Sequence, residues 1–234
     1  MTEPASPPRR IAVLASGGGS NLAALLSYFN AAESPVARVC VVMSDRPDAG
    51  ALGRASAAGV PAEVIGDPGD ARSLDEALRR HDVDIVVLAG YLRLVPAAVA
   101  AHYAGRIVNV HPALLPRHGG RGMHGARVHR AVLAAGDTAS GATVHFVDAE
   151  YDRGAAIVRA RVPVLAGDTA EALAGRVLVG EHFVLPRAVH ALAAGLVRLH
   201  ADGAATVDLS AAALFDHPPA GVQVELAPAP AHRD

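Results

Sequence analysis

The opening of the chain constrains its fold more than any other stretch. Residues 10–15, RIAVLA, have the apolar character of a buried strand, and SGGGSN follows directly. Residues 21–30 then place Leu22, Leu25 and Phe29 at helical spacing. A strand, a glycine-rich turn and a helix make up the first half of a βαβ unit, which needs a parallel partner strand. These residues therefore predict an α/β fold.

The same alternation continues along the chain. Further strands are predicted at 38–43, 62–65, 84–89, 106–111, 142–147 and 156–164. Further helices are predicted at 47–58, 73–81, 96–103, 126–135 and 169–197, and Pro186 is expected to kink or divide the last of them. Because DIVVLA at 84–89 is apolar on both faces, it suits a parallel sheet covered by helices. We predict a Rossmann-like, mostly parallel twisted sheet flanked by helices, with a small C-terminal hairpin around Asp202-Gly203.

The length of 234 residues fits one α/β domain with a small appendage. We expect residues 1–9 to be a disordered lead, 10–215 a single domain and 216–234 a loose tail rich in proline and alanine. Hydrophobic residues make up 51% of the chain, enough for a sizeable core. Neither a signal peptide nor a membrane span is recognisable, which predicts a cytoplasmic protein.

Charge and composition exclude several classes of function. A formal net charge of −2 gives no basic field for nucleic acid. The 21 basic residues are all arginine, which rules out a Schiff-base lysine and a Walker-type phosphate lysine. Cys40 is the single cysteine, and the 12 histidines show no local ligand spacing, so we expect no metal site.

The strand at 106–111 carries two polar side chains that matter for chemistry. Asn109 and His111 are two residues apart, so an extended chain points both to one face. Pro112 favours extended backbone at His111. An amide donor beside a group that carries a proton is what an acyl-transfer site needs. The alternative is that both side chains only satisfy loop backbone.

The glycine-rich turn predicts an anion site. Gly19, Ser20 and Asn21 lie where the first helix starts, so free N–H groups and the helix dipole favour a phosphate there. The dinucleotide fingerprint is incomplete because Leu22 takes the place of its last glycine. The alternative is that the glycines make only a tight strand-to-helix turn.

Two later loops add candidates. Residues 90–96, GYLRLVP, follow a predicted parallel strand, where ligand sites lie, and offer apolar surface for a flat ring. Asp152 lies in the turn 151–154, where an aspartate is usually a local backbone acceptor. The functional alternative is a carboxylate that orients His111 or holds a water. His145 shares a strand face with Thr143 but has no assigned role.

Four segments carry a resemblance to a known family. SGGGSNL, AGYLRL, NVHPALLP through GMHGARVHRAV, and SGATVHFVDAEYDRG occur in this order within residues 10–200. They resemble the folate formyltransferase family, and the first of them resembles its glycinamide ribonucleotide branch. The resemblance implies transfer of a formyl group from 10-formyltetrahydrofolate to the amine of 5-phosphoribosylglycinamide (GAR) in de novo purine biosynthesis. It implies small-molecule partners and no metal, and a homodimer stays open.

The resemblance also implies roles for single residues. His111 corresponds to the proton-transferring histidine, Asn109 to the asparagine that polarises the formyl oxygen, and Asp152 to the aspartate that supports the protonated histidine. The positions implied for the GAR phosphate and ribose are Gly19, Ser20, Asn21 and Glu181. Those implied for the folate, besides Asn109, are Arg72, Leu92, Arg93, Leu94 and Val95.

The chain departs from the family pattern at Leu178, in the longer glycine-rich loop at 117–125 and at Ser44-Asp45-Arg46, where Ser-Asn is usual, and rival functions stay open. Leu178 stands where a polar or basic phosphate contact is implied, and either Arg117 or Arg121 is a candidate for the missing charge. A formyltetrahydrofolate deformylase and a methionyl-tRNA formyltransferase are rivals within the family, though each usually carries a further domain. A non-catalytic Rossmann-type nucleotide-binding module is the rival outside it, with Asp45 as the acid that binds a ribose.

Overall fold

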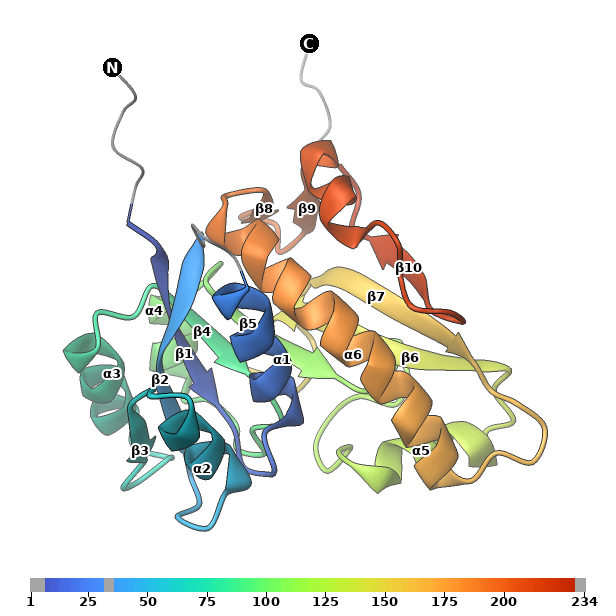
Figure 1. The fold of residues 1–234 in the computed structure, drawn as a ribbon, viewed down its shortest axis with the longest axis horizontal. Coiled ribbons are helices and arrows are strands. Elements are labelled where there is room, and N and C mark those ends of the chain that lie inside the picture. Colours follow the sequence, from blue (N-terminus) through green and yellow to red (C-terminus); the bar gives the residue numbers. More distant parts are fainter. Residues whose placement is uncertain (1–6, 32–35, 230–234) are drawn as a thin grey trace.

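The computed structural model describes residues 7–31 and 36–229 (Figure 1). Its main sheet has eight strands in the order β10-β7-β6-β5-β4-β1-β2-β3. The first seven strands along the chain are β1 (Arg9–Leu14), β2 (Ala37–Ser44), β3 (Ala62–Val64), β4 (Ile85–Leu88), β5 (Ile107–His111), β6 (Ala139–Phe146) and β7 (Ala156–Pro163). The helices are α1 (Ser20–Asn30), α2 (Gly50–Ala57), α3 (Ala71–Arg80), α4 (Ala97–His102), α5 (Ala126–Ala134) and α6 (Ala170–Ala193).

The sheet confirms the predicted α/β class and its mostly parallel character. β1 to β5 pair in parallel, whereas β6, β7 and β10 extend the sheet by antiparallel pairing beyond β5. β1 lies between β2 and β4 and pairs with both. The chain leaves β1 toward β2 and β3, and then returns to the other side of β1 with β4 and β5, so the strand order reverses between β1 and β4. In open α/β sheets, ligands bind beyond the carboxyl ends of the strands at such a reversal.

Helices cover both faces of the sheet and form a hydrophobic core on each. Because successive side chains of a strand point to opposite faces, alternate residues belong to different cores. In β1, Ile11 and Val13 pack with α1, α2, α5 and α6, whereas Ala12 and Leu14 pack with α3 and α4. The apolar character that predicted a buried strand thus serves two cores at once.

Helix α6 runs without a break through Pro186, so the prediction that Pro186 divides it was wrong. Its first turn is capped by Thr169, whose hydroxyl accepts a hydrogen bond from the Ala172 N–H at 3.1 Å. Pro186 is buried, as are its neighbours Leu185 and Ala188. Tertiary packing of this face outweighs the one helical hydrogen bond that proline removes.

The C-terminal part contains the predicted hairpin and, in the tail expected to be either poorly ordered or a loose strand, one strand that joins the main sheet. β8 (Val197–Leu199) and β9 (Ala205–Val207) form a separate antiparallel pair, and a 3₁₀ segment, η1 (Leu209–Phe215), follows. β10 (Gln223–Leu226) then pairs with β7, so the main sheet extends into residues expected to be a loose tail. Of the expected lead, residues 1–6 lie outside the described part, and Arg9 already belongs to β1. No helix in the described ranges is long and apolar enough to cross a membrane.

Candidate active site

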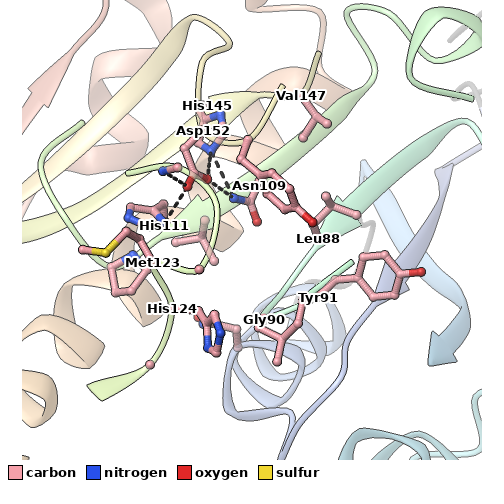
Figure 2. A pocket seen from close by; sticks show the side chains of 18 of the residues that line it. Leu88, Gly90, Tyr91, Asn109, His111, Met123, His124, His145, Val147 and Asp152 are labelled. Atoms are coloured by element: carbon pink, nitrogen blue, oxygen red, sulfur yellow. Dashed lines mark hydrogen bonds and ion pairs between the residues drawn. The ribbon is translucent and has the colours of Figure 1, made fainter. Parts of the chain in front are cut away.

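A cavity of about 560 Å³ lies beyond the carboxyl ends of β4 and β5. Its walls come from the start of α1, the loop 90–95, the end of β5, the loop 120–125, the segment 147–152 and helix α6. The volume lies within the range of small-molecule sites in proteins. Figure 2 shows Asn109, His111, His145 and Asp152 turned toward one another on one side of this cavity.

Asn109 is held by a histidine of the neighbouring strand. Asn109 in β5 lies opposite His145 in β6. The His145 Nδ1 is 2.7 Å from the Phe146 carbonyl oxygen, which only accepts, so Nδ1 carries a proton. In neutral His145 the other nitrogen, Nε2, therefore accepts from the Asn109 amide nitrogen at 3.0 Å. This bond fixes the orientation of the Asn109 amide.

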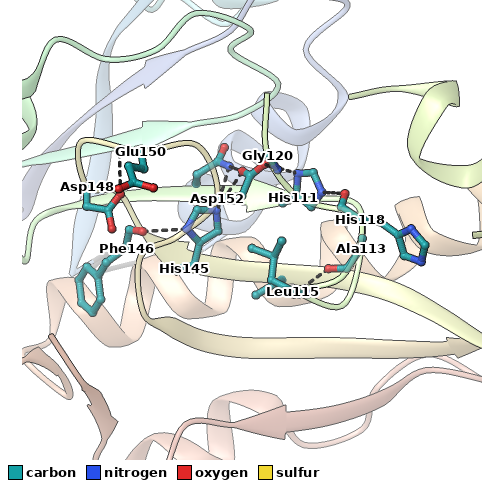
Figure 3. Close-up of polar contacts among 12 residues, drawn as sticks. His111, Ala113, Leu115, His118, Gly120, His145, Phe146, Asp148, Glu150 and Asp152 are labelled. Carbon is teal, nitrogen blue, oxygen red and sulfur yellow. Dashed lines mark hydrogen bonds and ion pairs between the residues drawn. The ribbon is translucent and has the colours of Figure 1, made fainter. Parts of the chain in front are cut away.

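Asp152 joins the two residues predicted from the strand. Its carboxylate lies 3.4 Å from the Asn109 Nδ2 and 3.4 Å from the His111 Nδ1. It also accepts the Gly120 N–H at 2.9 Å (Figure 3). Burial raises the pKa of this carboxyl, but the contact with His145, the His111 charge and the Gly120 N–H together lower it below its ordinary value. Asp152 therefore reaches across the site, and its carboxylate bonds none of the backbone of its own turn in the described chain.

His111 is buried, and each ring nitrogen has a different neighbour. Nε2 lies 2.9 Å from the His118 carbonyl oxygen, so this nitrogen donates, whereas Nδ1 faces Asp152. Burial lowers the pKa of His111, and the nearby Asp152 raises it by less, so the net shift is downward. Asp152 thus acts in the predicted direction, but desolvation is the larger effect on this pKa.

The glycine-rich turn has a packing reason for one of its glycines. Gly19 adopts a φ of +76°, and a Cβ there would lie 2.8 Å from the Ala51 Cα of α2. Neither Gly19 nor Ser20 lines the cavity, whereas Asn21 does. Gly17 and Gly18 are exposed, and a Cβ on either meets nothing within 4 Å. Gly19 therefore serves the contact between α1 and α2, and the open backbone is that of Gly17 and Gly18.

Asn21 and Glu181 form a buried polar pair in the cavity wall. The Asn21 Nδ2 donates to the Glu181 carboxylate at 2.5 Å, and both residues line the cavity. Burial raises the pKa of Glu181 to about 7, and the bond from Asn21 only partly opposes this effect. Glu181 is therefore a carboxyl that titrates near neutral pH within reach of a bound molecule.

Glu181→Gln is expected to stabilise the protein at pH 8. The folded-state pKa of about 7 lies above the ordinary 4.5, so the unfolded chain ionises first and unfolding is favoured as pH rises from 4.5 to 7. Glutamine keeps the acceptor for Asn21 and removes this effect. The gain in unfolding free energy should be absent at pH 4, grow between pH 4.5 and pH 7, and reach on the order of 1–3 kcal/mol at pH 8. Urea unfolding of both proteins at pH 4 and pH 8 measures it, and equal differences at the two values would contradict the burial argument.

The loop after β4 is anchored to the first two strands. The Leu92 N–H donates to the Ser16 hydroxyl at 3.0 Å, and that hydroxyl donates to Asp45 at 2.6 Å. Arg93 pairs with the other oxygen of Asp45 at 3.1 Å. The segment predicted to bind a flat ring, Leu92, Arg93, Leu94 and Val95, lines the cavity. Because Asp45 is buried and bonded to Ser16 and Arg93, it does not offer its carboxylate to a ribose.

Of the three arginines outside the loop after β4 that are predicted to contact a substrate, only one lines the main cavity. Arg72 lies exposed on α3, pairs with Glu76 at 2.8 Å and does not line the cavity. Arg117 pairs with Asp137 at 2.6 Å and lies at a second, smaller cavity of about 230 Å³. Arg121 lines the main cavity together with Leu178. Of the two candidates for the missing charge, Arg121 is therefore the one at the site.

Two contributors to the site were missed by the sequence reasoning. His145 was noticed on its strand face, and its position opposite Asn109 depends on the β5–β6 register, which no local pattern reveals. Gly120 contributes a backbone N–H, which has no sequence signal beyond the four glycines of residues 117–125, the glycine-rich loop after β5. Among the described residues, no group of three or more His, Cys, Asp or Glu side chains is arranged to hold a metal ion.

The fold and site together define an α/β enzyme with a His–Asp pair and an amide at the carboxyl end of a central strand. Residues 9–189 match the formyl transferase family. The chain belongs to this family and, within it, to the phosphoribosylglycinamide formyltransferases.

Individual relatives support this assignment. The chain is 39% identical over 206 residues to the chloroplastic phosphoribosylglycinamide formyltransferase of Arabidopsis thaliana, covering 84% of this chain and 70% of that protein. It is 38% identical to the phosphoribosylglycinamide formyltransferase of Escherichia coli (strain K12), covering 83% and 92%. The crystal structure of the enzyme from Anaplasma phagocytophilum matches with a TM-score of 0.78 at 36% identity, covering 86% and 95%. By contrast, the chain spans only 14% of a trifunctional purine biosynthetic protein of Drosophila pseudoobscura pseudoobscura.

Proposed function

We propose that the chain transfers the formyl group of 10-formyltetrahydrofolate to the primary amine of GAR, giving formyl-GAR and tetrahydrofolate in de novo purine biosynthesis. The observation that carries this proposal is the convergence of Asn109, His111 and Asp152 in one cavity, beside the start of α1. The names of the relatives supply GAR as the formyl acceptor, and the family resemblance implies 10-formyltetrahydrofolate as the donor. The folate is a cosubstrate, and no step needs a metal.

The reaction forms one C–N bond and breaks another. The GAR amine attacks the formyl carbon, and the tetrahedral oxyanion forms beside Asn109 and His111, which starts the reaction protonated at Nδ1 as well as Nε2. The Asn109 Nδ2 lies 3.0 Å from the His145 Nε2 and 3.4 Å from the Asp152 carboxylate. We assign the N–H on the side of the longer contact, toward Asp152, to the oxyanion. The C–N10 bond of the folate then breaks, the attacking nitrogen loses a proton and N10 gains one. We assign this transfer to the His111 Nδ1 and a water at Asp152.

The start of α1 beside the cavity, together with residues of the cavity wall, offers groups that suit the ribonucleotide. The free N–H groups at the start of α1 favour its phosphate, and Gly17 and Gly18 leave the backbone open to approach. Arg121 supplies a positive charge from the glycine-rich loop. Asn21 and Glu181 offer polar groups to the ribose or the amine. We keep Ser20 and Gly19 as parts of the phosphate turn, with Gly19 acting through its backbone.

The folate has an apolar wall opposite. Leu92 and Leu94 are 44% and 38% exposed and line the cavity, so both present apolar surface to a bound molecule. Together with Val95 they offer a surface for a flat ring. Arg93, paired with Asp45, lies beside this surface. We keep Arg72 only as a contact for a folate tail that extends beyond the cavity.

Gly18→Ala is expected to raise the KM for GAR roughly tenfold or more, about the effect of losing one hydrogen bond to a charged group. A methyl group there meets no protein atom, so it interferes only with a ligand on the turn. The KM for the folate should stay unchanged. The matched control is Gly53→Ala in α2, where a Cβ also meets nothing within 4 Å. Equal losses for both substrates would favour a purely structural turn.

One assay separates this function from its rivals. Purified protein is given 10-formyltetrahydrofolate with and without GAR, and formyl-GAR and formate are measured. Formyl-GAR supports the proposal, whereas formate release without GAR identifies a deformylase. Binding of a nicotinamide dinucleotide without turnover would identify a nucleotide-binding module. The homodimer, the cytoplasmic location and the single domain at 10–215 stay predictions, and light scattering tests the first.

A further inference from the structure

The segment from Arg117 to Gly120 crosses the His111–Asp152 pair and contacts both members (Figure 3). The His118 carbonyl oxygen accepts from the His111 Nε2 at 2.9 Å. Two residues later, the Gly120 N–H donates to Asp152 at 2.9 Å. The position of this short backbone segment therefore sets the polar environment of the pair.

The backbone at His118 has an uncommon conformation for a residue other than glycine. Its φ is +57°, in the left-handed region that disfavours most side chains. Two contacts to one carboxylate hold it there. The His118 Nε2 and the Arg117 guanidinium lie 2.6 Å from the two different oxygens of Asp137. The side chains of His118 and Asp137 are only 15% and 12% exposed, so this contact is largely shielded from water.

The carbonyl of His118 decides which nitrogen of His111 titrates. Because a carbonyl only accepts, Nε2 keeps its proton in both charge states of the ring. Nδ1 is then the nitrogen that gains and loses a proton, 3.4 Å from Asp152. If the carbonyl moved away, neutral His111 would divide between two tautomers, and only one has Nδ1 ready to accept a proton beside Asp152.

We propose that Asp137 and His118 are positioning residues for the reaction, because the hydrogen bond between them holds the loop carbonyl that fixes the tautomer of His111. Arg117 is the exposed second partner of Asp137 and contributes less. The inference rests on the proposed function for its effect on turnover, but the effect on the tautomer does not depend on any substrate. The same carboxylate thereby connects the turn after α5 to the site.

The ring of His111 has other titratable neighbours that any measurement must include. Asp152, His145, His118 and His129 all face it or influence its charge. The variants below leave Asp152, His145 and His129 in place. A change in His111 therefore reports the loop and not the loss of one of these three groups.

The test is Asp137→Asn, with Asp75→Asn as its matched control. Asp75 also bridges a histidine and an arginine, His102 at 2.5 Å and Arg79 at 2.7 Å, but on α3 and α4 away from the cavity. We expect Asp137→Asn to lower kcat roughly tenfold to a hundredfold with little change in either KM. The ¹⁵N chemical shifts of the free protein should show His111 moving from the Nε2–H tautomer to a mixture. Asp75→Asn should change neither.

A second variant guards against loss of folding. His118→Asn keeps a residue that tolerates left-handed backbone but shortens the side chain so that it no longer reaches Asp137. His118→Asn should show the same loss of kcat and the same mixture of His111 tautomers as Asp137→Asn. An unchanged His111 tautomer in a folded Asp137 or His118 variant overturns the proposal, even if kcat falls. Mixed tautomers together with the absence of any GAR formylation by the wild type would overturn the proposed function and leave the positioning role intact.

Discussion

Replacing His111 with alanine is expected to lower kcat by roughly 10²- to 10⁴-fold, the range that a positioned acid–base group contributes. His111 Nδ1 is the only ring nitrogen free to exchange a proton, since Nε2 is bound to the His118 carbonyl. The substitution leaves that carbonyl without its donor, which should cost about 1–3 kcal/mol of stability. The protein should therefore fold but turn over poorly, as steady-state kinetics and thermal unfolding will measure.

His81→Ala is the matched control for this prediction. His81 also pairs with a carboxylate, Glu63 at 2.6 Å, but does not line the cavity. Its kcat should equal that of the wild type. Full activity in folded His111→Ala would remove His111 from the mechanism.

Asn109→Ala is expected to lower kcat roughly 10²- to 10³-fold, as for a lost oxyanion donor.

Replacing Asp152 with asparagine is expected to lower the pKa of His111 further and to change the pH dependence of the reaction. Burial already lowers this pKa, and the Asp152 charge is the main effect that opposes burial. Asparagine keeps the shape and removes the charge. With less protonated His111 available, kcat/KM should fall at every pH above the pKa of the variant.

The sign of the pH effect follows from the protonated fraction of His111. Well below both pKa values, wild type and variant are fully protonated and differ little through this route. As pH rises past the pKa of the variant, the ratio of wild-type to variant kcat/KM should grow, and it should level off above the pKa of the wild type. Profiles from pH 5 to pH 8 and NMR titration of His111 measure it. An unmoved His111 pKa would show that Asp152 does not support the imidazolium.

Much of the site was predictable because strand geometry is local. The spacing of Asn109 and His111 on one strand placed both at the cavity, and the segment from Leu92 to Val95 lines it as expected. Asp152 needed the resemblance, because its turn would equally suit a local acceptor. Arg72 was the weakest expectation, and it lies outside the cavity because α3 covers the other face of the sheet.

The sequence by itself determined the α/β class, the strand and helix order and the polar residues at the strand ends, because each depends on hydrophobic period and backbone preference over a few residues. The tertiary structure alone decided the pairing of β10 with β7, the unbroken helix through Pro186 and the contacts around His111. Each of these joins segments far apart in the chain, where packing outweighs local propensity. The tautomer of His111 is the sharpest case, since it depends on a backbone carbonyl held by the remote carboxylate of Asp137.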